Sequence, residues 1–427
     1  MPRVMLIIVL CILLPFSLTA CTTDAHELND WAFVHTIGVD KGVSDQLRFT
    51  FQMATYKGSG GGSVSGTGGG SGSQGNKDHA VISIDCPTFY SGINMLNTSL
   101  SRTLNFMHSK YLIISEELAR DGVERFINGM MRSYQIRRSM YVIIVKGSAS
   151  DFIKEFNPVI GTSITKTQEL IMDHQYETGL FAEVTYNEFS IGLKNTYTQP
   201  TAALAAINDF SSFKTGGAPP EEFKSGGDYY AGELPREGGN KYEFFGTALF
   251  DGDKMIGELS GDETRAMLMM KGEFQDASIA IPDPIDSKLR LGFYVHQQKK
   301  PNIKITFKDG EPVIHVKVSL EGSLQNVQSS TEYEGEELKP VAEKALETFI
   351  KDNFDKTIDK CKSLNCEAFG FGETAAMQFL TIQEWEEYNW IAHFKYAEVT
   401  TEVEFIMQRT GTIMKTSEIN TTEGKKK

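Results

Sequence analysis

Residues 111–122 read YLIISEELARDG, and this short stretch decides the class of fold that the chain can adopt. Its first four residues are apolar and β-prone, which predicts a buried strand. Ser115 can cap a following helix, and Glu116 and Glu117 fall in its first turn, where the helix dipole favours acidic side chains. We expect that helix to continue to about Arg132, so that a strand passes directly into a helix.

The alternation of strand and helix continues on both sides of this stretch. Residues 81–85 and 140–145 each predict another strand. Apolar side chains follow the first of them at helical spacing, at Phe89, Ile93, Leu96, Leu100 and Leu104. Three strands joined by helices of this length fit right-handed parallel crossovers. Residues 81–146 are therefore expected to form part of a mixed or parallel sheet, in a mixed α/β (α+β) fold.

A hairpin is predicted before this region. Residues 32–39 and 47–55 both read as strands, and the second alternates apolar with polar side chains. Asp40-Lys41-Gly42 lies in the connection between them. One face of this hairpin should therefore be buried.

Residues 58–75 form a compositionally distinct run with ten glycines and five serines. This composition is typical of a flexible coil that contributes nothing to a core. Gly70, Gly72 and Gly75 match the spacing of the dinucleotide-binding fingerprint, but a strand follows where that fingerprint requires a helix N-terminus. No cofactor is therefore expected at this loop, or elsewhere in the chain.

A second run of turn-forming residues divides the sequence near its middle. Residues 208–240 contain three Gly-Gly pairs and three prolines among charged residues, which makes this segment the best candidate for a linker. The organisation that follows is multi-domain, with an N-terminal α/β region at 21–207 and a C-terminal α/β domain at 241–416. The polar tail at 417–427 is expected to be disordered.

The C-terminal half predicts antiparallel strands and one long helix. Residues 303–307 alternate, Asp309-Gly310 turns the chain and residues 313–320 return. Residues 338–361 place an apolar stripe along one helix face, formed by Ala342, Leu346, Ile350, Phe354, Ile358 and Cys361. The ion pairs Glu347–Lys351 and Asp352–Lys356 are predicted on the solvent-exposed face of this helix. A long amphipathic strand is expected at 399–407.

The net charge restricts the possible partners. The chain carries 56 Asp and Glu against 42 Lys and Arg, a formal charge of -14. This excess of negative charge opposes sequence-independent binding to the phosphate backbone of nucleic acid. We therefore expect no nucleic-acid binding. It also opposes attachment to an anionic membrane by charge alone, so that a membrane contact needs a separate hydrophobic device.

The first twenty residues supply such a device. Arg3 precedes an uncharged stretch at 4–18, which is shorter than the ~20 residues of a spanning helix and typical of a secretory signal peptide. Leu18-Thr19-Ala20-Cys21 looks like a bacterial lipobox. We therefore expect residues 1–20 to be removed as a signal peptide and Cys21 to carry the lipid. A plain signal peptide in which Cys21 stands by chance is the alternative.

The other cysteines indicate neither a disulfide framework nor a metal site. Cys86, Cys361 and Cys366 are left after export, and no His or Asp cluster accompanies the last two, so no metal is expected. A disulfide between Cys361 and Cys366 is chemically possible outside the cytoplasm. Free thiols near the end of a helix are the favoured interpretation.

Motifs that would indicate catalysis are missing from the sequence. No Gly-x-Ser-x-Gly elbow and no His-Glu-x-x-His helix occurs, and the eight His are scattered. His108 is interpreted as a structural residue and not as a general base. The aromatic residues Trp385, Tyr388, Trp390 and Phe394 could stack on a ligand, but at helical spacing they are interpreted as core. We predict no catalytic residues and no enzyme.

Short motifs of the N-terminal half resemble those of one known family. ELND stands at 27–30 and IGVDKG at 37–42, and His108-Ser109-Lys110 leads to ISEELARDG at 114–122. The match continues in register at Arg132, Ile136-Arg137-Arg138 and Val145-Lys146-Gly147.

The C-terminal half carries further motifs in the same order as that family. They are GTALF at 246–250, DKMIGELS at 253–260 and ETR at 263–265. A last group comprises Phe369-Gly370-Phe371-Gly372-Glu373, Trp385, Trp390, Phe394 and Gly411. Over roughly residues 21–415 the chain thus resembles the Ger(x)C family, the C subunits of spore germinant receptors. The segment 22–26 and the length of the Gly/Ser run depart from the family pattern.

The resemblance implies a function at a membrane. It implies a non-enzymatic lipoprotein on the outer face of the spore inner membrane, held there by the lipid on Cys21. There it would assemble with a membrane-embedded A subunit and a transporter-like B subunit into a receptor that senses small nutrients and triggers germination.

Two other functions remain open from the sequence. A solute-binding lipoprotein that delivers a small molecule to a transporter normally has two matched lobes, whereas the halves here differ in pattern. An exported hydrolase is disfavoured by the missing motifs. Ligand-induced thermal stabilisation separates the first of these from a receptor subunit, because a ligand at 100 times its Kd adds ~2.7 kcal/mol to stability.

Overall fold

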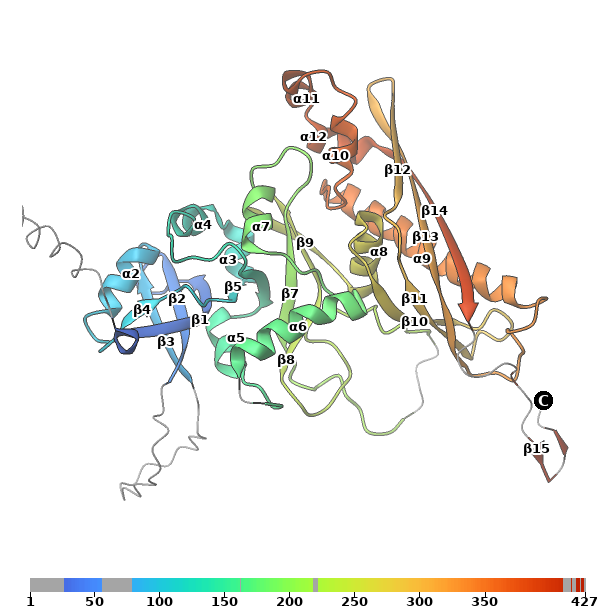
Figure 1. Cartoon of the computed structure of the whole chain (residues 1–427), viewed down its shortest axis with the longest axis horizontal. Helices are drawn as coiled ribbons and strands as arrows, with labels where there is room; N and C mark the ends of the chain where they lie inside the picture. Colours follow the sequence, from blue (N-terminus) through green and yellow to red (C-terminus); the bar gives the residue numbers. More distant parts are fainter. Residues whose placement is uncertain are drawn as a thin grey trace, which may run out of the picture.

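The computed structural model describes residues 27–55, 79–161, 163–217, 222–409, 416, 420–422 and 424–425. The predicted signal peptide, Cys21 and the Gly/Ser run at 58–75 therefore lie outside the described residues. The described part has the mixed α/β fold that the sequence predicts, with two sheets and the helices packed on them (Figure 1).

A nine-stranded mixed sheet forms the first half of the molecule. Its strand order is β3-β2-β1-β5-β6-β7-β8-β9, and β4 pairs with β1. The strands are β1 (Trp31–Lys41), β2 (Leu47–Ala54), β3 (His79–Cys86), β4 (Thr103–Asn105), β5 (Tyr111–Ser115), β6 (Tyr141–Lys146), β7 (Thr201–Ile207), β8 (Tyr242–Asp251) and β9 (Lys254–Leu259). β5 pairs in parallel with both β1 and β6, and β1 and β2 form the predicted antiparallel hairpin.

Both faces of this sheet are buried, which explains the unbroken apolar run in β5. Tyr111 and Ile113 belong to one hydrophobic cluster, together with α5 (Ala149–Glu155) and α6 (Ile164–Thr178). Leu112 and Ile114 belong to the other cluster, on the opposite face. Successive side chains of a strand alternate between faces, so a strand covered on both sides must be apolar throughout.

On the opposite face the two predicted helices end early, and all the helices there are short. They are α2 (Phe89–Leu96), α3 (Glu116–Asp121), α4 (Glu124–Met130) and α7 (Tyr186–Gly192). α2 ends at Leu96, because the hydroxyls of Thr98 and Ser99 bond to backbone carbonyls of its last turn. The helix expected from residue 116 to about 132 is broken at Gly122, whose φ of +125° no helix can contain.

The second sheet has five strands and carries the long helix. The order is β10-β11-β13-β12, and β14 pairs with β13. The strands are β10 (Asp276–Pro282), β11 (Arg290–His296), β12 (Asn302–Lys308), β13 (Glu311–Val327) and β14 (Glu398–Arg409). β12 and β13 form the predicted hairpin, whereas β14 runs parallel to β13 and not antiparallel as expected for this unit.

The long helix α9 (Lys339–Ser363) packs on this sheet with the predicted stripe. All six of the predicted stripe residues are buried. The ion pairs predicted for Glu347 and Asp352 do not form. Glu347 instead accepts from the amide of Phe405 on β14 and pairs with Lys344, because the edge of the neighbouring strand competes for its carboxylate.

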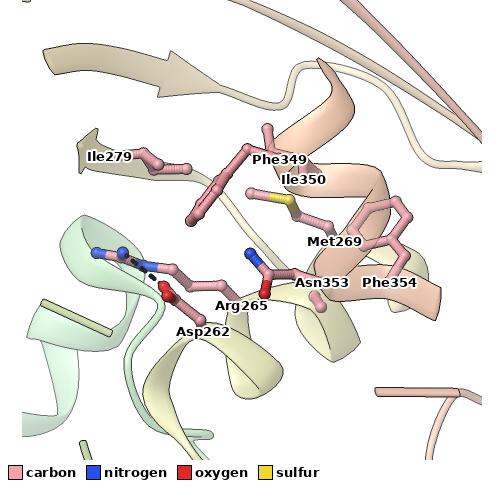
Figure 2. Close-up of a pocket in the computed structure, with 9 residues that line it drawn as sticks. Asp262, Arg265, Met269, Ile279, Phe349, Ile350, Asn353 and Phe354 are labelled. Atoms are coloured by element: carbon pink, nitrogen blue, oxygen red, sulfur yellow. Dashed lines mark hydrogen bonds and ion pairs between the residues drawn. The ribbon is translucent and has the colours of Figure 1, made fainter. Parts of the chain in front are cut away.

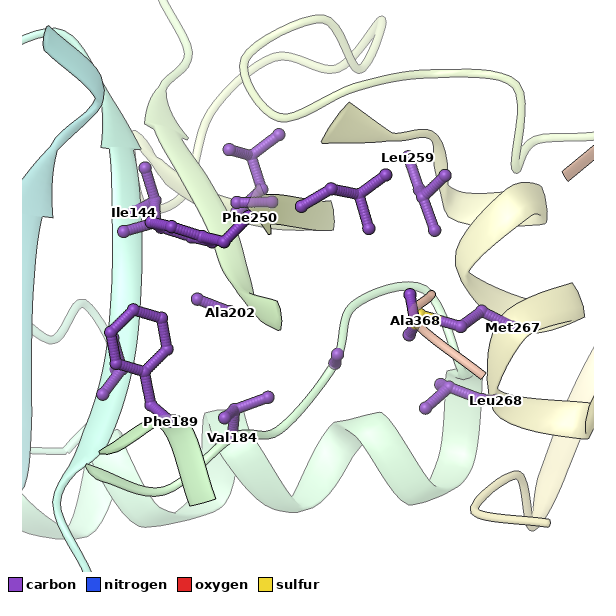
Figure 3. Close-up of a cluster of buried hydrophobic side chains, with 14 of the residues drawn as sticks. Ile144, Val184, Phe189, Ala202, Phe250, Leu259, Met267, Leu268 and Ala368 are labelled. Atoms are coloured by element: carbon purple, nitrogen blue, oxygen red, sulfur yellow. The ribbon is translucent and has the colours of Figure 1, made fainter. Parts of the chain in front are cut away.

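Helix α8 (Gly261–Lys271) lies between the two sheets. Further helices, α10 (Phe371–Ala376), α11 (Ile382–Tyr388), α12 (Trp390–His393) and the 3-10 turns η1 (Leu28–Asp30) and η2 (Phe394–Tyr396), complete the fold. In Figure 3, labelled side chains of α8, Met267 and Leu268, face Phe189 and Phe250 of the first half and Ala368 of the segment after α9. One continuous hydrophobic core therefore joins the two halves.

The segment predicted as a linker connects two neighbouring strands of one sheet. Ile207 at the end of β7 pairs with Tyr242 at the start of β8, so residues 208–241 leave the sheet and return beside the point of departure. β8 and β9 thus complete the first sheet, although they follow the segment 208–240. In the tail predicted to be disordered, described residues pair as β15 (Asn420–Thr421) with β16 (Gly424–Lys425).

Candidate functional site

The only functional residue predicted from the sequence, Cys21, lies outside the described residues. The described chain begins at Glu27, and η1 leads directly into β1 of the first sheet. Between Cys21 and Trp31, the first residue of the nine-stranded sheet, lie the nine residues 22–30. None of the helices among the described residues is long and apolar enough to cross a membrane.

The most elaborate polar arrangement lies where α8 begins, between the two sheets. Ser260 and Glu263 form a capping box, in which Ser260 accepts from the amide of Glu263 and Glu263 accepts from the amide of Ser260 at 2.8 Å. Lys360 of α9 donates to Glu263 at 2.6 Å and to the hydroxyl of Tyr230 at 3.0 Å. One ion pair thus ties α9, α8 and the segment before β8 together.

A buried ion pair lies on the first turn of the same helix. Arg265 donates to Asp262 at 3.4 Å, and the two side chains are only 10% and 7% exposed. The guanidinium also donates to the carbonyl of Thr178 at the end of α6 (2.8 Å) and to that of Ser278 on β10 (3.4 Å). Burial raises the pKa of Asp262 and lowers that of Arg265, since both charges have lost most of their water.

This pair forms one wall of a recess between α8, α9 and β10 (Figure 2). The remaining lining is apolar apart from Asn353, and consists of Ala266, Met269, Ile279, Phe349, Ile350 and Phe354. The recess offers about 10 Å³, the space of one water molecule. It is therefore too small for a nutrient molecule, and the arrangement is a joint between the sheets and not a ligand cavity.

A second buried acid follows the end of α9. Glu367 is fully buried, and its Oε1 accepts from the amides of Phe369 (3.0 Å) and Phe371 (3.1 Å). Its Oε2 has no partner among the described residues. Burial raises the pKa of Glu367 to about 7. Glu367 was not predicted as a site residue from the sequence, although an acid inside the otherwise apolar run CEAFGF at 366–371 is a signal for one.

The cysteines beside Glu367 are buried and free. Cys86, Cys361 and Cys366 are all unpaired, which confirms the favoured interpretation of free thiols. Burial raises the pKa of Cys361 and Cys366, so neither is a reactive thiolate. No group of three or more His, Cys, Asp or Glu side chains in the described ranges is placed to hold a metal ion.

The aromatic residues that could have stacked on a ligand belong to the core. Trp385, Trp390 and Phe394 are all buried, and the two indole rings stack with centroids 5.9 Å apart. The Nε1 of Trp385 donates to Thr196 at 2.9 Å. The interpretation of this cluster as core is confirmed.

His108 occupies an exposed turn beside the hairpin. Its ring meets that of Phe33 edge-on at 4.9 Å. Burial, and then the neighbouring His108 and His79, lower the pKa of His35 to about 4, so His35 is neutral at physiological pH.

Two family models match the chain in tandem. The first, described as "Spore germination protein N-terminal domain", matches residues 24–207. The second, described as "Spore germination B3/ GerAC like, C-terminal", matches residues 245–411. Together they cover both sheets and leave out most of the segment between β7 and β8.

Curated relatives from Bacillus subtilis (strain 168) match this chain over more than half of its length, and two of them match about nine-tenths of it. YfkR, provisionally named a spore germination protein, is 26% identical over 89% of this chain and 91% of its own length. Spore germination protein KC is 23% identical over 91% of this chain and 90% of its own length. Spore germination protein B3 is 24% identical over 58% of this chain and 60% of its own length.

A solved structure has the same fold. The crystal structure of the GerBC protein superposes with a TM-score of 0.51 at 18% identity, covering 90% of this chain and all of that chain. The family models, the relatives and this fold agree with the motifs read from the sequence. The chain therefore belongs to the Ger(x)C family of spore germination proteins, whose members are not enzymes.

Proposed function

We propose that this chain is the lipid-anchored C subunit of a nutrient germinant receptor, on the outer face of the spore inner membrane. It would act by contact with a membrane-embedded A subunit and a transporter-like B subunit. The observation that carries the proposal is the tandem match of the chain to both spore germination models, at 24–207 and 245–411.

The sequence before the first sheet supports the anchor. Residues 18–21 have the form of a lipobox, and the five residues 22–26 separate Cys21 from the described chain. A diacylglyceryl group binds a bilayer firmly, because each buried methylene contributes ~0.8 kcal/mol. Anchoring would raise the effective concentration of the partners by confining all of them to one surface.

The buried sites support a role in contact and not in chemistry. The recess beside Asp262 and Arg265 holds about one water molecule, and both charged groups are engaged with the backbone or with each other. The thiols of Cys361 and Cys366 are buried and protonated. These groups stabilise the joint between the sheets, which would give the partners a rigid body to bind.

The test compares the lipidated chain with a soluble form in spores. The wild-type chain is expected in the membrane fraction, with the mass of a diacylglyceryl group on its N-terminal Cys21 peptide and with the A and B subunits in the purified complex. A form secreted through a cleavable signal without the lipobox should fold but respond poorly to nutrients. It should respond normally to triggers that bypass the receptor.

Two results would contradict the proposal. One is a wild-type chain that co-purifies with neither receptor subunit. The other, which concerns the anchor alone, is fully normal nutrient germination by the soluble form at native abundance.

A further inference from the structure

Three exposed apolar side chains stand close together in the sequence where α10 connects to α11. Met377, Leu380 and Ile382 are 78%, 93% and 69% exposed. They lie within six residues of one another, and we call the segment 377–382 the apolar tip. Figure 1 shows α10, α11 and α12 at one extremity of the C-terminal half, beside the end of β12. Clustered apolar exposure of this kind marks an interaction surface more often than scattered single residues do.

The backbone of the apolar tip is held in place from inside. Gln378, the residue after Met377, donates through Nε2 to the carbonyl of Ile305 on β12 at 2.5 Å. The ring of Phe379 packs against those of Phe307, Trp385 and Tyr388, at centroid distances of 5.3 to 5.5 Å. These contacts tie the backbone between the exposed residues to β12 and to α11.

The start of α11 fixes the rest of the tip. Thr381 caps the helix by accepting from the amide of Glu384 at 3.2 Å, and Glu384 accepts from the amide of Leu380 at 3.1 Å. These two bonds order the backbone at Leu380 and at the start of α11. A surface that is already ordered loses little conformational entropy when it binds a partner.

Acidic side chains surround the tip. The segment 371–388 contains Glu373, Glu384, Glu386 and Glu387 and no Lys or Arg, a formal charge of -4. All four carboxylates are exposed. Glu386 stands one helical turn after Ile382, and Glu373 stands one turn before Met377, so each acid lies beside an exposed apolar residue.

We propose that the apolar tip docks into a protein partner that presents an apolar socket bordered by Lys or Arg side chains. The acidic rim argues against two other occupants. An anionic lipid surface would repel it, and an isologous contact between two copies of this chain would bring like charges together. The inference rests on the proposed function in one respect only, which is that the receptor's A and B subunits are the expected partners.

The test places a photo-crosslinking amino acid at Leu380 in the full-length chain, in spore membranes. The matched control places it at Ile160, which is 90% exposed and lies in the first half of the chain. The expected result is a protein adduct from Leu380 but not from Ile160. Its mass should identify the A or B subunit, with the crosslinked peptide next to Lys or Arg residues.

Charge reversal then tests the rim. Glu386→Lys combined with Glu387→Lys should lower the adduct yield about tenfold, the change expected for ~1.4 kcal/mol of lost interaction. Glu386→Asp should preserve the yield. Both positions are exposed and outside the core, so an unchanged melting temperature verifies that the fold is intact.

Each remaining outcome contradicts the proposal in a distinguishable way. Adducts from Leu380 mainly to lipid would indicate a membrane contact, and adducts between two copies of the chain would indicate a dimer. If the chain co-purifies with the receptor subunits but Leu380 yields no more adduct than Ile160, the tip is not the docking surface and the proposed function stands. If the chain co-purifies with neither subunit, the proposed function fails. The tip inference then fails as well unless Leu380 forms a protein adduct that charge reversal removes.

Discussion

Gln199 and Glu367 lie 168 residues apart in the sequence and are joined by two reciprocal hydrogen bonds. The amide of Glu367 donates to the side-chain oxygen of Gln199 at 2.7 Å, and the amide of Gln199 donates to the carbonyl of Glu367 at 2.8 Å. Gln199 leads into β7 of the first sheet, and Glu367 follows the long helix on the second. The two hydrogen bonds therefore connect the first sheet to the segment that follows α9. They lie beside the buried carboxyl of Glu367, whose pKa is raised.

Glu367 should make stability depend on pH. Burial raises its pKa from an ordinary 4.5 to about 7, although the amides of Phe371 and Phe369 oppose the shift. The folded state therefore binds the proton more tightly than the unfolded state. The resulting stabilisation is fully present below about pH 4.5 and is lost as the pH rises through about 7.

Glu367→Gln should flatten this dependence, because the amide cannot ionise. At pH 8 the variant should be more stable than the wild type, by up to about 3 kcal/mol. Urea unfolding of the soluble body between pH 4.5 and 8 measures the effect, and Glu337→Gln, at an exposed position, is the control. Equal slopes in Glu367→Gln and the wild type would show that folding does not raise the pKa of Glu367.

Asp262 should be required for the stability of the fold, because Arg265 is buried and needs a counter-charge. Asp262→Ala leaves the guanidinium without its counter-charge, and should lower the free energy of unfolding by about 3–5 kcal/mol. The double variant Asp262→Ala with Arg265→Met should lose less than the sum of the two single variants, since it removes both charges. Denaturant unfolding of all four proteins gives the coupling energy. Additive losses would mean that the two side chains do not interact.

Glu243 should hold the segment between β7 and β8 in place. Its buried carboxylate accepts from Asn208 at 2.7 Å, from the amides of Gly232 and Leu234, and from Arg236 at 2.9 Å. Glu243→Ala removes the acceptor that these donors share, leaves the amides of Gly232 and Leu234 without their partner, and should cost about 3 kcal/mol.

Limited proteolysis provides a local measurement of the same effect. Trypsin should cleave the Glu243→Ala variant after Arg236 faster than it cleaves the wild type, since this side chain loses its ion pair with Glu243. Glu237→Ala, at an exposed position of the same segment, serves as the control. Equal cleavage rates in the two variants would mean that other contacts order this segment.

Gly246 should not tolerate a side chain. Its φ is +89°, and a Cβ there would come within 2.3 Å of the carbonyl oxygen of Leu259 on the paired strand β9. Gly246→Ala should destabilise the protein by at least about 2 kcal/mol. Gly310 has a φ of +88° with nothing within 4 Å of its Cβ position, so Gly310→Ala reports the backbone strain alone. Similar losses in both variants would show that the contact with Leu259 relaxes at little cost.

Shortening the Gly/Ser run should leave stability nearly unchanged. Ala54 at the end of β2 pairs with His79 at the start of β3, so the two ends of the intervening chain already lie side by side. A short turn in place of residues 58–75 removes no apolar side chain other than Val64 and reduces loop-closure entropy. The melting temperature should change by no more than a few degrees. A larger fall would show that the run contributes to the fold.

The sequence by itself determined the helices and hairpins that depend only on interactions between residues close together in the chain. Spacing of apolar side chains placed the stripe from Ala342 to Cys361 on one helix, and alternation together with Asp309-Gly310 placed the β12–β13 hairpin. Both follow from periodicity and turn chemistry that operate within about twenty residues. The motifs were likewise sufficient to indicate the family, because they preserve residue identity along the chain.

Only the tertiary structure decided the contacts made across the chain. Composition marked residues 208–240 as a linker, yet β8 after it pairs with β7 before it, and Glu243 binds the intervening segment. Strand pairing depends on long-range burial and hydrogen bonding that no local pattern encodes. For the same reason Glu367 could not be assigned its raised pKa, nor Leu380 its exposure. Desolvation and accessibility are set by the residues that fold around a side chain, and these come from distant parts of the sequence.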